Sequence, residues 1–279
     1  MSEVAGGGAG EGIVEVTPGR AIAWTAVGEG PPLLLLNGYA ATGADWDPVF
    51  LGGLAAHFRV ITPDSVGLGR STLAEGEAVG AAAGMTVDAV ALLDALGIER
   101  ATVVGWSMGG FVAQSLARAA PDRVAALGLI STHPGSTDTV DAAPGVFQVL
   151  IDHSGTPREQ ATRLLSLLFP PDRAAEADER FGDLVAAARA ELPEPVLFMQ
   201  EEAIVDWHNR PTALPVLDPA IPTAVIHGGS DTVVPPGNAE ALARFHPGAS
   251  VTVLPECAHA PMAQEPAAVA EAIIAVARP

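Results

Sequence analysis

One serine stands where it could act as a nucleophile. Gly105-Trp106-Ser107-Met108-Gly109 has the form G-x-S-x-G and joins a predicted strand, Ala101–Gly105, to a predicted helix, Gly109–Ala120. A serine on such a turn raises its Oγ above the sheet, and the amide of the next residue, Met108, points toward a developing oxyanion. The glycines leave room for the tight turn. The pattern predicts nucleophilic catalysis by Ser107.

A catalytic serine needs a base, and the base needs an acid to orient it. His259 follows the predicted strand Val251–Leu254, and Asp231 follows the predicted strand Ala224–His227. Open parallel sheets bind ligands at the carboxyl ends of their strands. Because Ser107, Asp231 and His259 also occur in the chain order that this motif requires, we predict that they form a triad. The alternatives are a helix cap for Asp231 and a solvated surface position for His259.

The elements that must position these residues alternate along the chain. Further strands are predicted at Ile13–Val16, Ala21–Val27, Leu33–Leu36, Val60–Thr62 and Val124–Ile130, and further helices at Val87–Leu96, Gly237–Phe245 and Pro266–Ala277. The rhythm breaks over 134–215, which is Pro-rich and mostly helical. We therefore predict an α/β fold with a mostly parallel sheet flanked by helices, built from 13–133 and 216–279. Residues 134–215 would form a helical lid, and the Gly-rich residues 1–12 a flexible lead-in.

The amino-acid composition excludes several classes of partner and of catalytic mechanism. The 279 residues include 14 basic and 33 acidic side chains, for a net charge of −19, and 49% are hydrophobic. A chain this acidic repels phosphate backbones and anionic lipids, so we expect no nucleic-acid or membrane partner. All the basic residues are arginine, which excludes a lysine Schiff base. With one cysteine and no signal peptide, we expect a cytoplasmic monomer or homodimer that acts on a small molecule.

A further segment completes a family resemblance. Residues 60–71 contain Asp64-Ser65-Val66-Gly67-Leu68-Gly69-Arg70-Ser71, of the form D-x-x-G-x-G-x-S. Together with the G-x-S-x-G turn and the loop 228–235, this makes residues 20–279 outside the insertion resemble the α/β-hydrolase superfamily, in its esterase, lactonase and C–C hydrolase branch. The resemblance implies a structural role for Asp64. Some members place the acid after the sixth strand, where Asp138 and Asp141 stand here.

The resemblance also implies the second oxyanion donor. In the family this amide follows a His-Gly pair after the third strand, and here the pair is Asn37-Gly38, so the donor would be the amide of Tyr39. The exchange of His for Asn keeps the backbone donor but changes the hydrogen bonding of the loop.

The expected reaction is hydrolysis of a carboxylic ester or lactone through an acyl-enzyme on Ser107. A dehalogenase or epoxide hydrolase of this fold would need a carboxylate at position 107. The alternatives are C–C bond hydrolysis of a vinylogous diketone, a non-hydrolytic lyase, cyclase or acyltransferase, and a receptor-like binder with slow turnover.

The substrate is expected to be small to medium-sized and mostly apolar. Neither zinc-ligand spacing nor a dinucleotide-binding glycine motif is present, so we expect no metal and no cofactor. The side chains predicted to line the pocket are Trp106, Phe147, Leu168, Phe198, Trp207 and Val234.

Overall fold

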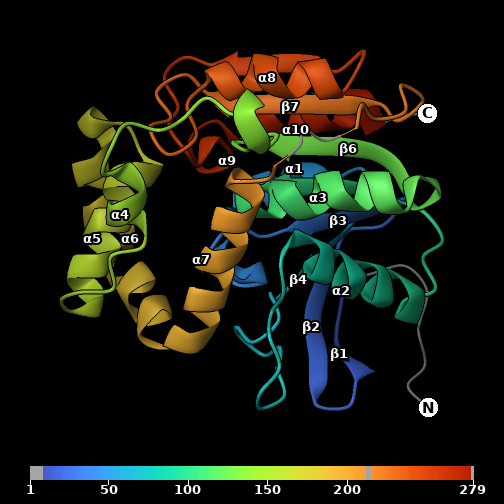
Figure 1. Ribbon diagram of the computed structural model, residues 1–279, viewed down its shortest axis with the longest axis horizontal. Coiled ribbons are helices and arrows are strands. Elements are labelled where there is room, and N and C mark those ends of the chain that lie inside the picture. The colour runs from blue at the N-terminus through green and yellow to red at the C-terminus, as the bar shows by residue number, and fades with distance from the viewer. Residues whose placement is uncertain (1–8, 212–214, 278–279) are drawn as a thin grey trace.

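The sheet organises the molecule. A computed structural model describes residues 9–211 and 215–277, in which eight strands are ordered β1-β2-β4-β3-β5-β6-β7-β8 (Figure 1). Strand β2 is antiparallel to β1 and β4, and every neighbouring pair from β4 to β8 is parallel. The strands are β1 (Gly10–Thr17), β2 (Arg20–Val27), β3 (Pro32–Leu36), β4 (Arg59–Pro63), β5 (Ala101–Trp106), β6 (Val124–Ile130), β7 (Thr223–Gly228) and β8 (Ser250–Leu254). This confirms the predicted α/β fold.

The start of β1 corrects one expectation. Residues 10–12, expected in a flexible lead-in, pair with β2 instead, and Gly12 lies opposite Trp24. A Cβ at Gly12 would lie 3.1 Å from the Trp24 ring, so the glycine lets the indole cover the strand. Backbone pairing with β2 orders this segment in spite of its glycine content. Residues 1–8 of the predicted lead-in lie outside the described residues.

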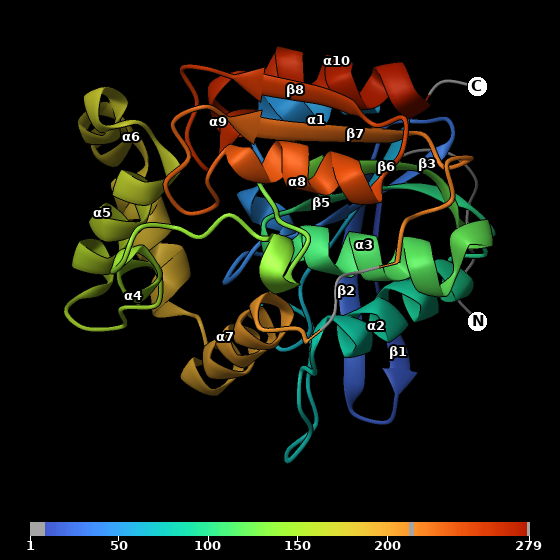
Figure 2. The ribbon, with the colours of Figure 1, turned by 45° about the horizontal axis from the view of Figure 1, so that its top comes forward.

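Helices cover both faces of the sheet. Figure 2 shows α3 (Met108–Ala119) and α8 (Gly237–Phe245) on one side of the strands and α1 (Pro48–Ala55) and α10 (Pro266–Ala277) on the other. Helix α2 (Ala82–Ala95) packs on the α3 side, and the short α9 (Pro261–Gln264) packs on the α10 side. Along the inner strands β3, β4, β5, β6 and β7 side chains alternate between the two cores, which is why these strands read as continuous apolar runs.

Helix α1 was not predicted from the sequence. Its first turn is set by Asp47, whose carboxylate accepts hydrogen bonds from the amides of Val49 and Phe50 at 2.9 Å, and by Pro48 at the first helical position. Phe50 and Leu54 anchor it on the sheet. The helix is too short and too uniformly apolar to show a clear helical period.

Between β6 and β7 the described residues form four α-helices. They are α4 (Val146–Leu150), α5 (Pro157–Leu168), α6 (Pro171–Ala190) and α7 (Glu194–His208). Figure 1 shows α4, α5 and α6 grouped beside the sheet, with α7 between this group and α3. Arg158 of α5 and Asp178 of α6 form an ion pair at 2.6 Å. Within the described ranges, no helix has the length and apolar character needed to cross a bilayer.

The core packing predicts unequal costs for two leucine truncations. Leu93 of α2 is fully buried, whereas Leu184 of α6 is 71% exposed. We expect Leu93→Ala to lower the free energy of unfolding by about 2–5 kcal/mol, because it leaves a cavity against the sheet. Leu184→Ala should change it by less than about 0.5 kcal/mol. Urea denaturation followed by circular dichroism measures both, and equal losses would contradict the packing described here.

Candidate active site

Ser107 occupies a strained turn between β5 and α3. Its φ is +52° and its ψ is −118°, a conformation that residues other than glycine seldom adopt. Two contacts with the end of β6 hold the turn: the Ser107 amide donates to the Ile130 carbonyl at 2.9 Å, and the Thr132 hydroxyl donates to the Ser107 carbonyl at 2.8 Å. Strain maintained in this way is typical of functional sites.

The glycines of the motif are required by close backbone packing. A Cβ on Gly105 would overlap the carbonyl of Gly109, and a Cβ on Gly109 would overlap the carbonyl of Leu36 at the end of β3. The first turn of α3 therefore lies directly against β3. The two glycines of the G-x-S-x-G motif are therefore needed because the strand, the turn and the helix approach one another so closely.

The three predicted triad residues meet in space. His259 Nε2 lies 3.0 Å from Ser107 Oγ, and His259 Nδ1 lies 2.9 Å from Asp231 Oδ2. The side chains of His259 and Asp231 are 3% and 0% exposed, so His259 does not occupy the solvated surface position considered as an alternative. The second oxygen, Asp231 Oδ1, accepts the amides of Val233 and Val234 at 2.9 Å each. Backbone amides thus hold one oxygen of the carboxylate, and the other oxygen contacts the imidazole of His259.

The two acids considered as alternatives lie elsewhere. Asp141 Oδ1 is 3.5 Å from His208 Nε2, and Asp138 Oδ1 is 3.7 Å from Arg244 Nη2. Asp64, expected to be structural, accepts the amides of Gly43 and Arg70 at 3.0 Å.

Two backbone segments beside Ser107 carry the predicted oxyanion donors. Met108 is the first residue of α3, so its amide has no partner within the helix. Tyr39 follows β3, and Asn37 ties this loop down: its Nδ2 donates to the Pro63 carbonyl at 2.6 Å, while its Oδ1 accepts from Trp46 Nε1 at 2.7 Å. The asparagine therefore links the loop to the end of β4 and to the segment before α1.

Helix α7 holds the Tyr39 loop from the other side. Gln200 Oε1 accepts the amide of Ala40 at 2.9 Å, and the Tyr39 hydroxyl donates to Glu201 Oε1 at 2.6 Å. His153 Nε2 lies 2.6 Å from the same Glu201 oxygen. Burial and the Glu201 carboxylate raise the pKa of Tyr39, which keeps its hydroxyl protonated as a donor. Sequence analysis did not find Gln200 or Glu201, because no local motif marks a helix that reaches back to a loop so distant in the chain.

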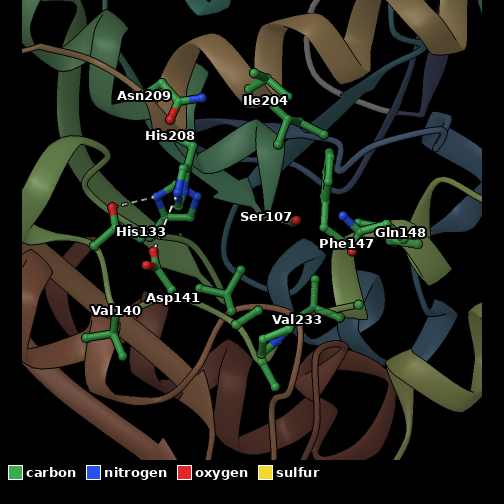
Figure 3. A pocket seen from close by; sticks show the side chains of 18 of the residues that line it. Ser107, His133, Val140, Asp141, Phe147, Gln148, Ile204, His208, Asn209 and Val233 are labelled. Atoms are coloured by element: carbon green, nitrogen blue, oxygen red, sulfur yellow. Dashed lines mark hydrogen bonds and ion pairs between the residues drawn. The ribbon is translucent and has the colours of Figure 1, made fainter.

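A cavity of about 430 Å³ opens beside Ser107. Two of the predicted pocket residues, Phe147 and Val234, line it. Figure 3 shows His133 and His208 on one side of the Ser107 oxygen and Phe147 and Gln148 on the other. The full lining is Ser107, Phe111, His133, Thr139, Val140, Asp141, Ala142, Ala143, Pro144, Gly145, Phe147, Gln148, Leu150, Ile204, Val205, His208, Asn209, Val233 and Val234.

The other four predicted pocket residues lie outside this lining. Trp106 packs against Trp46 and donates from Nε1 to the His259 carbonyl at 2.8 Å. Trp207 is 2% exposed and stacks on Phe111, with ring centroids 5.0 Å apart.

Leu168 and Phe198 are displaced from the cavity for different reasons. Leu168 packs against the core on the α1 and α10 side of the sheet, and its carbonyl accepts the Ala260 amide at 3.2 Å. Phe198 is 51% exposed on α7, beside His153. On α7 the cavity face carries Ile204 and His208, four residues apart, so the neighbouring position 207 faces α3 instead.

Comparison with known proteins identifies the family. Residues 31–266 match the family model described as the alpha/beta hydrolase fold. The chain belongs to the α/β-hydrolase family. This α/β hydrolase is similar to the pimeloyl-[acyl-carrier protein] methyl ester esterase of Pectobacterium carotovorum, with 29% identity over 263 residues that cover 91% of this chain and 98% of the relative.

Solved structures agree with the family assignment. A hydrolase from Pseudomonas aeruginosa superposes with a TM-score of 0.77 and 28% identity, covering 95% of this chain and 97% of that one. A thermophilic esterase from Thermogutta terrifontis gives a TM-score of 0.71 and 27% identity, with coverage of 95% and 96%. An enol-lactonase from Burkholderia xenovorans shares the fold at 23% identity and a TM-score of 0.74, covering 95% of this chain and 99% of that one.

The packing at the turn predicts opposite effects of two glycine replacements. Gly109→Ala should lower the free energy of unfolding by about 1–3 kcal/mol or more, because its Cβ meets a backbone carbonyl that cannot move aside. Gly52→Ala is the matched control, since a Cβ there meets nothing within 4 Å and α1 continues through it. It should raise stability by about 0.5–1 kcal/mol. Chemical denaturation compares the two, and a stable Gly109→Ala variant would refute the close approach.

Proposed function

We propose that this α/β hydrolase is a serine esterase that cleaves carboxylic esters or lactones through an acyl-enzyme on Ser107. The observation that carries the proposal is the continuous hydrogen-bonded chain from Ser107 Oγ through His259 to Asp231, at 3.0 and 2.9 Å. Such a chain lets the serine lose its proton to the imidazole as it attacks a carbonyl carbon.

The remaining contacts supply the other requirements of acyl transfer. Asp231 keeps the proton of the neutral imidazole on Nδ1, so that Nε2 is free to accept the serine proton, and it stabilises the imidazolium that results. The amides of Met108 and Tyr39 are the donors for the oxyanion, and a donor of this kind contributes about 2.7–4 kcal/mol to transition-state stabilisation. His259 then returns the proton to the leaving alcohol and activates water against the acyl-enzyme.

The cavity volume favours a substrate of modest size, and the named relatives favour an ester over a C–C bond. The cavity of about 430 Å³ is in the range of sites for small molecules, roughly 300–1,000 Å³. The relatives named as pimeloyl-[acyl-carrier protein] methyl ester esterases and the Thermogutta esterase share 27–29% identity with this chain. A neighbour named as a 2-hydroxy-6-oxo-6-phenylhexa-2,4-dienoate hydrolase shares 22% and an esterase from Rhodococcus shares 23%, and both of these support the fold alone. Ester hydrolysis is therefore placed ahead of the cleavage of a vinylogous diketone.

The triad assignment predicts a large and selective loss of activity. Ser107→Ala should lower kcat for p-nitrophenyl butyrate by about 10⁴-fold or more while the fold is retained. Asp231→Asn should cost about 10⁴-fold, because it favours the wrong imidazole tautomer. Asp138→Asn is the control, since this acid faces Arg244 and not His259, and it should leave kcat within about twofold. Loss of activity in Asp138→Asn with an active Asp231→Asn would move the acid to the end of β6.

The hydrogen bond between Tyr39 and Glu201 predicts that its loss changes kcat without a matching change in KM. Glu201→Gln and Tyr39→Phe each weaken the anchor of the loop that carries one oxyanion amide, and each should lower kcat about tenfold with KM within about twofold. Glu202→Gln, one residue along α7 and exposed, is the control and should not change kcat. Equal kcat values for all variants would remove the loop from the catalytic machinery.

A further inference from the structure

One wall of the cavity beside Ser107 is polar, although sequence analysis predicted an apolar pocket. His133, which follows β6, lines this wall together with His208 and Asn209 at the end of α7. Figure 3 shows the His133 and His208 side chains close together, facing the same space as the Ser107 oxygen. None of these three side chains has a part in the triad.

The tautomer of His133 follows from its neighbours. His133 Nδ1 lies 3.1 Å from the amide nitrogen of Gly135, and a backbone N–H can only donate, so Nδ1 is the acceptor. Burial lowers the pKa of His133 to about 3, so the ring is uncharged at neutral pH. A neutral imidazole whose Nδ1 accepts carries its proton on Nε2. His133 therefore offers one fixed N–H donor.

The ring has little freedom to turn this donor away. His133 is 7% exposed and packs against Phe111, with ring centroids 4.7 Å apart. Its carbonyl accepts hydrogen bonds from Trp207 Nε1 and Gln114 Nε2, both at 3.1 Å. Within residues 9–211 and 215–277, Nε2 has no hydrogen-bond partner.

The fixed N–H of His133 favours substrates that place a hydrogen-bond acceptor beside it. When a ligand fills the cavity and displaces water, an apolar chain leaves the His133 N–H without a partner, whereas a chain with an oxygen at that point satisfies it. Sites built around such a donor discriminate strongly against analogues that lack the acceptor.

We propose that the substrate is an ester or lactone that carries a second, uncharged oxygen acceptor, such as a keto or ether oxygen, which receives the hydrogen bond of His133 Nε2. This inference rests on the proposed esterase function and replaces the expectation of a mostly apolar substrate. A carboxylate is a poor occupant, because the described lining contains no arginine to compensate for the loss of its hydration. The ligand class is thus a neutral keto- or alkoxy-ester.

Methyl esters of nearly equal size test the proposal. Methyl hexanoate, methyl 4-oxohexanoate, methyl 5-oxohexanoate and monomethyl glutarate differ in whether they present a methylene, a ketone or a carboxylate within chains of similar length. We expect kcat/KM for at least one keto ester to exceed that for methyl hexanoate by about tenfold or more, as is typical of one hydrogen bond to a buried donor. Monomethyl glutarate should be the poorest substrate.

Substitutions of the donor separate its effect from general packing. His133→Phe keeps an aromatic ring against Phe111 but removes the N–H, and it should bring the keto ester to within about twofold of methyl hexanoate. His133→Gln retains a side-chain donor and should keep part of the preference. His57→Phe is the same exchange at an exposed position far from the cavity and should leave the ratio unchanged.

The outcomes distinguish this inference from the function on which it rests. Ester hydrolysis without any preference for a keto ester in the unmodified protein overturns the inference alone, as does a preference that survives in His133→Phe. If His133→Phe does not fold, the unmodified protein and His133→Gln still test the inference: an absent keto-ester preference in the former, or an undiminished preference in the latter, overturns it. If all the esters stay intact and a fluorophosphonate leaves Ser107 unlabelled, the esterase proposal fails and this inference fails with it.

Discussion

The close approach of α3 to the end of β3 is the constraint on which the site depends. It requires glycine at 109, because the carbonyl of Leu36 occupies the space of a side chain, and it requires glycine at 105 for the same reason within the turn. Between these two glycines Ser107 adopts a φ of +52°, and Met108 begins α3 directly after it. The turn at Ser107, the first turn of α3 and the end of β3 are therefore joined by one packing contact.

The helical insertion contributes to the site at two points. One part of α7 holds the Tyr39 loop through Gln200 and Glu201, and the following turns face the cavity through Ile204 and His208. A shift of this helix would therefore move the Tyr39 loop and one wall of the cavity together. In this arrangement the sheet and the loops that follow its strands carry Ser107, Asp231 and His259, while the insertion holds the Tyr39 loop and forms part of the cavity lining.

His133, on the polar wall of the cavity, was not among the site residues predicted from the sequence, although it follows a strand end. His133 follows β6 at the same carboxyl edge that places Asp231 after β7 and His259 after β8, so the rule that located the triad also applied to it. Its role was hidden because a histidine without a motif partner has no local signature. Its tautomer and its orientation come from Gly135, Phe111 and Trp207, which the fold brings together.

The sequence by itself determined the parallel sheet, the strained turn at Ser107 and the chain order of the three triad residues. These features are encoded by short apolar runs, glycine spacing and positions at strand ends, all of which act over a few residues. Only the tertiary structure decided which side chains line the cavity. Trp207 and His208 are neighbours on α7, yet one is buried against α3 and the other faces the cavity, because a rotation of about 100° per residue separates them and the docking of the helix fixes its face. Local pattern cannot specify that docking, since it depends on contacts between segments far apart in the chain.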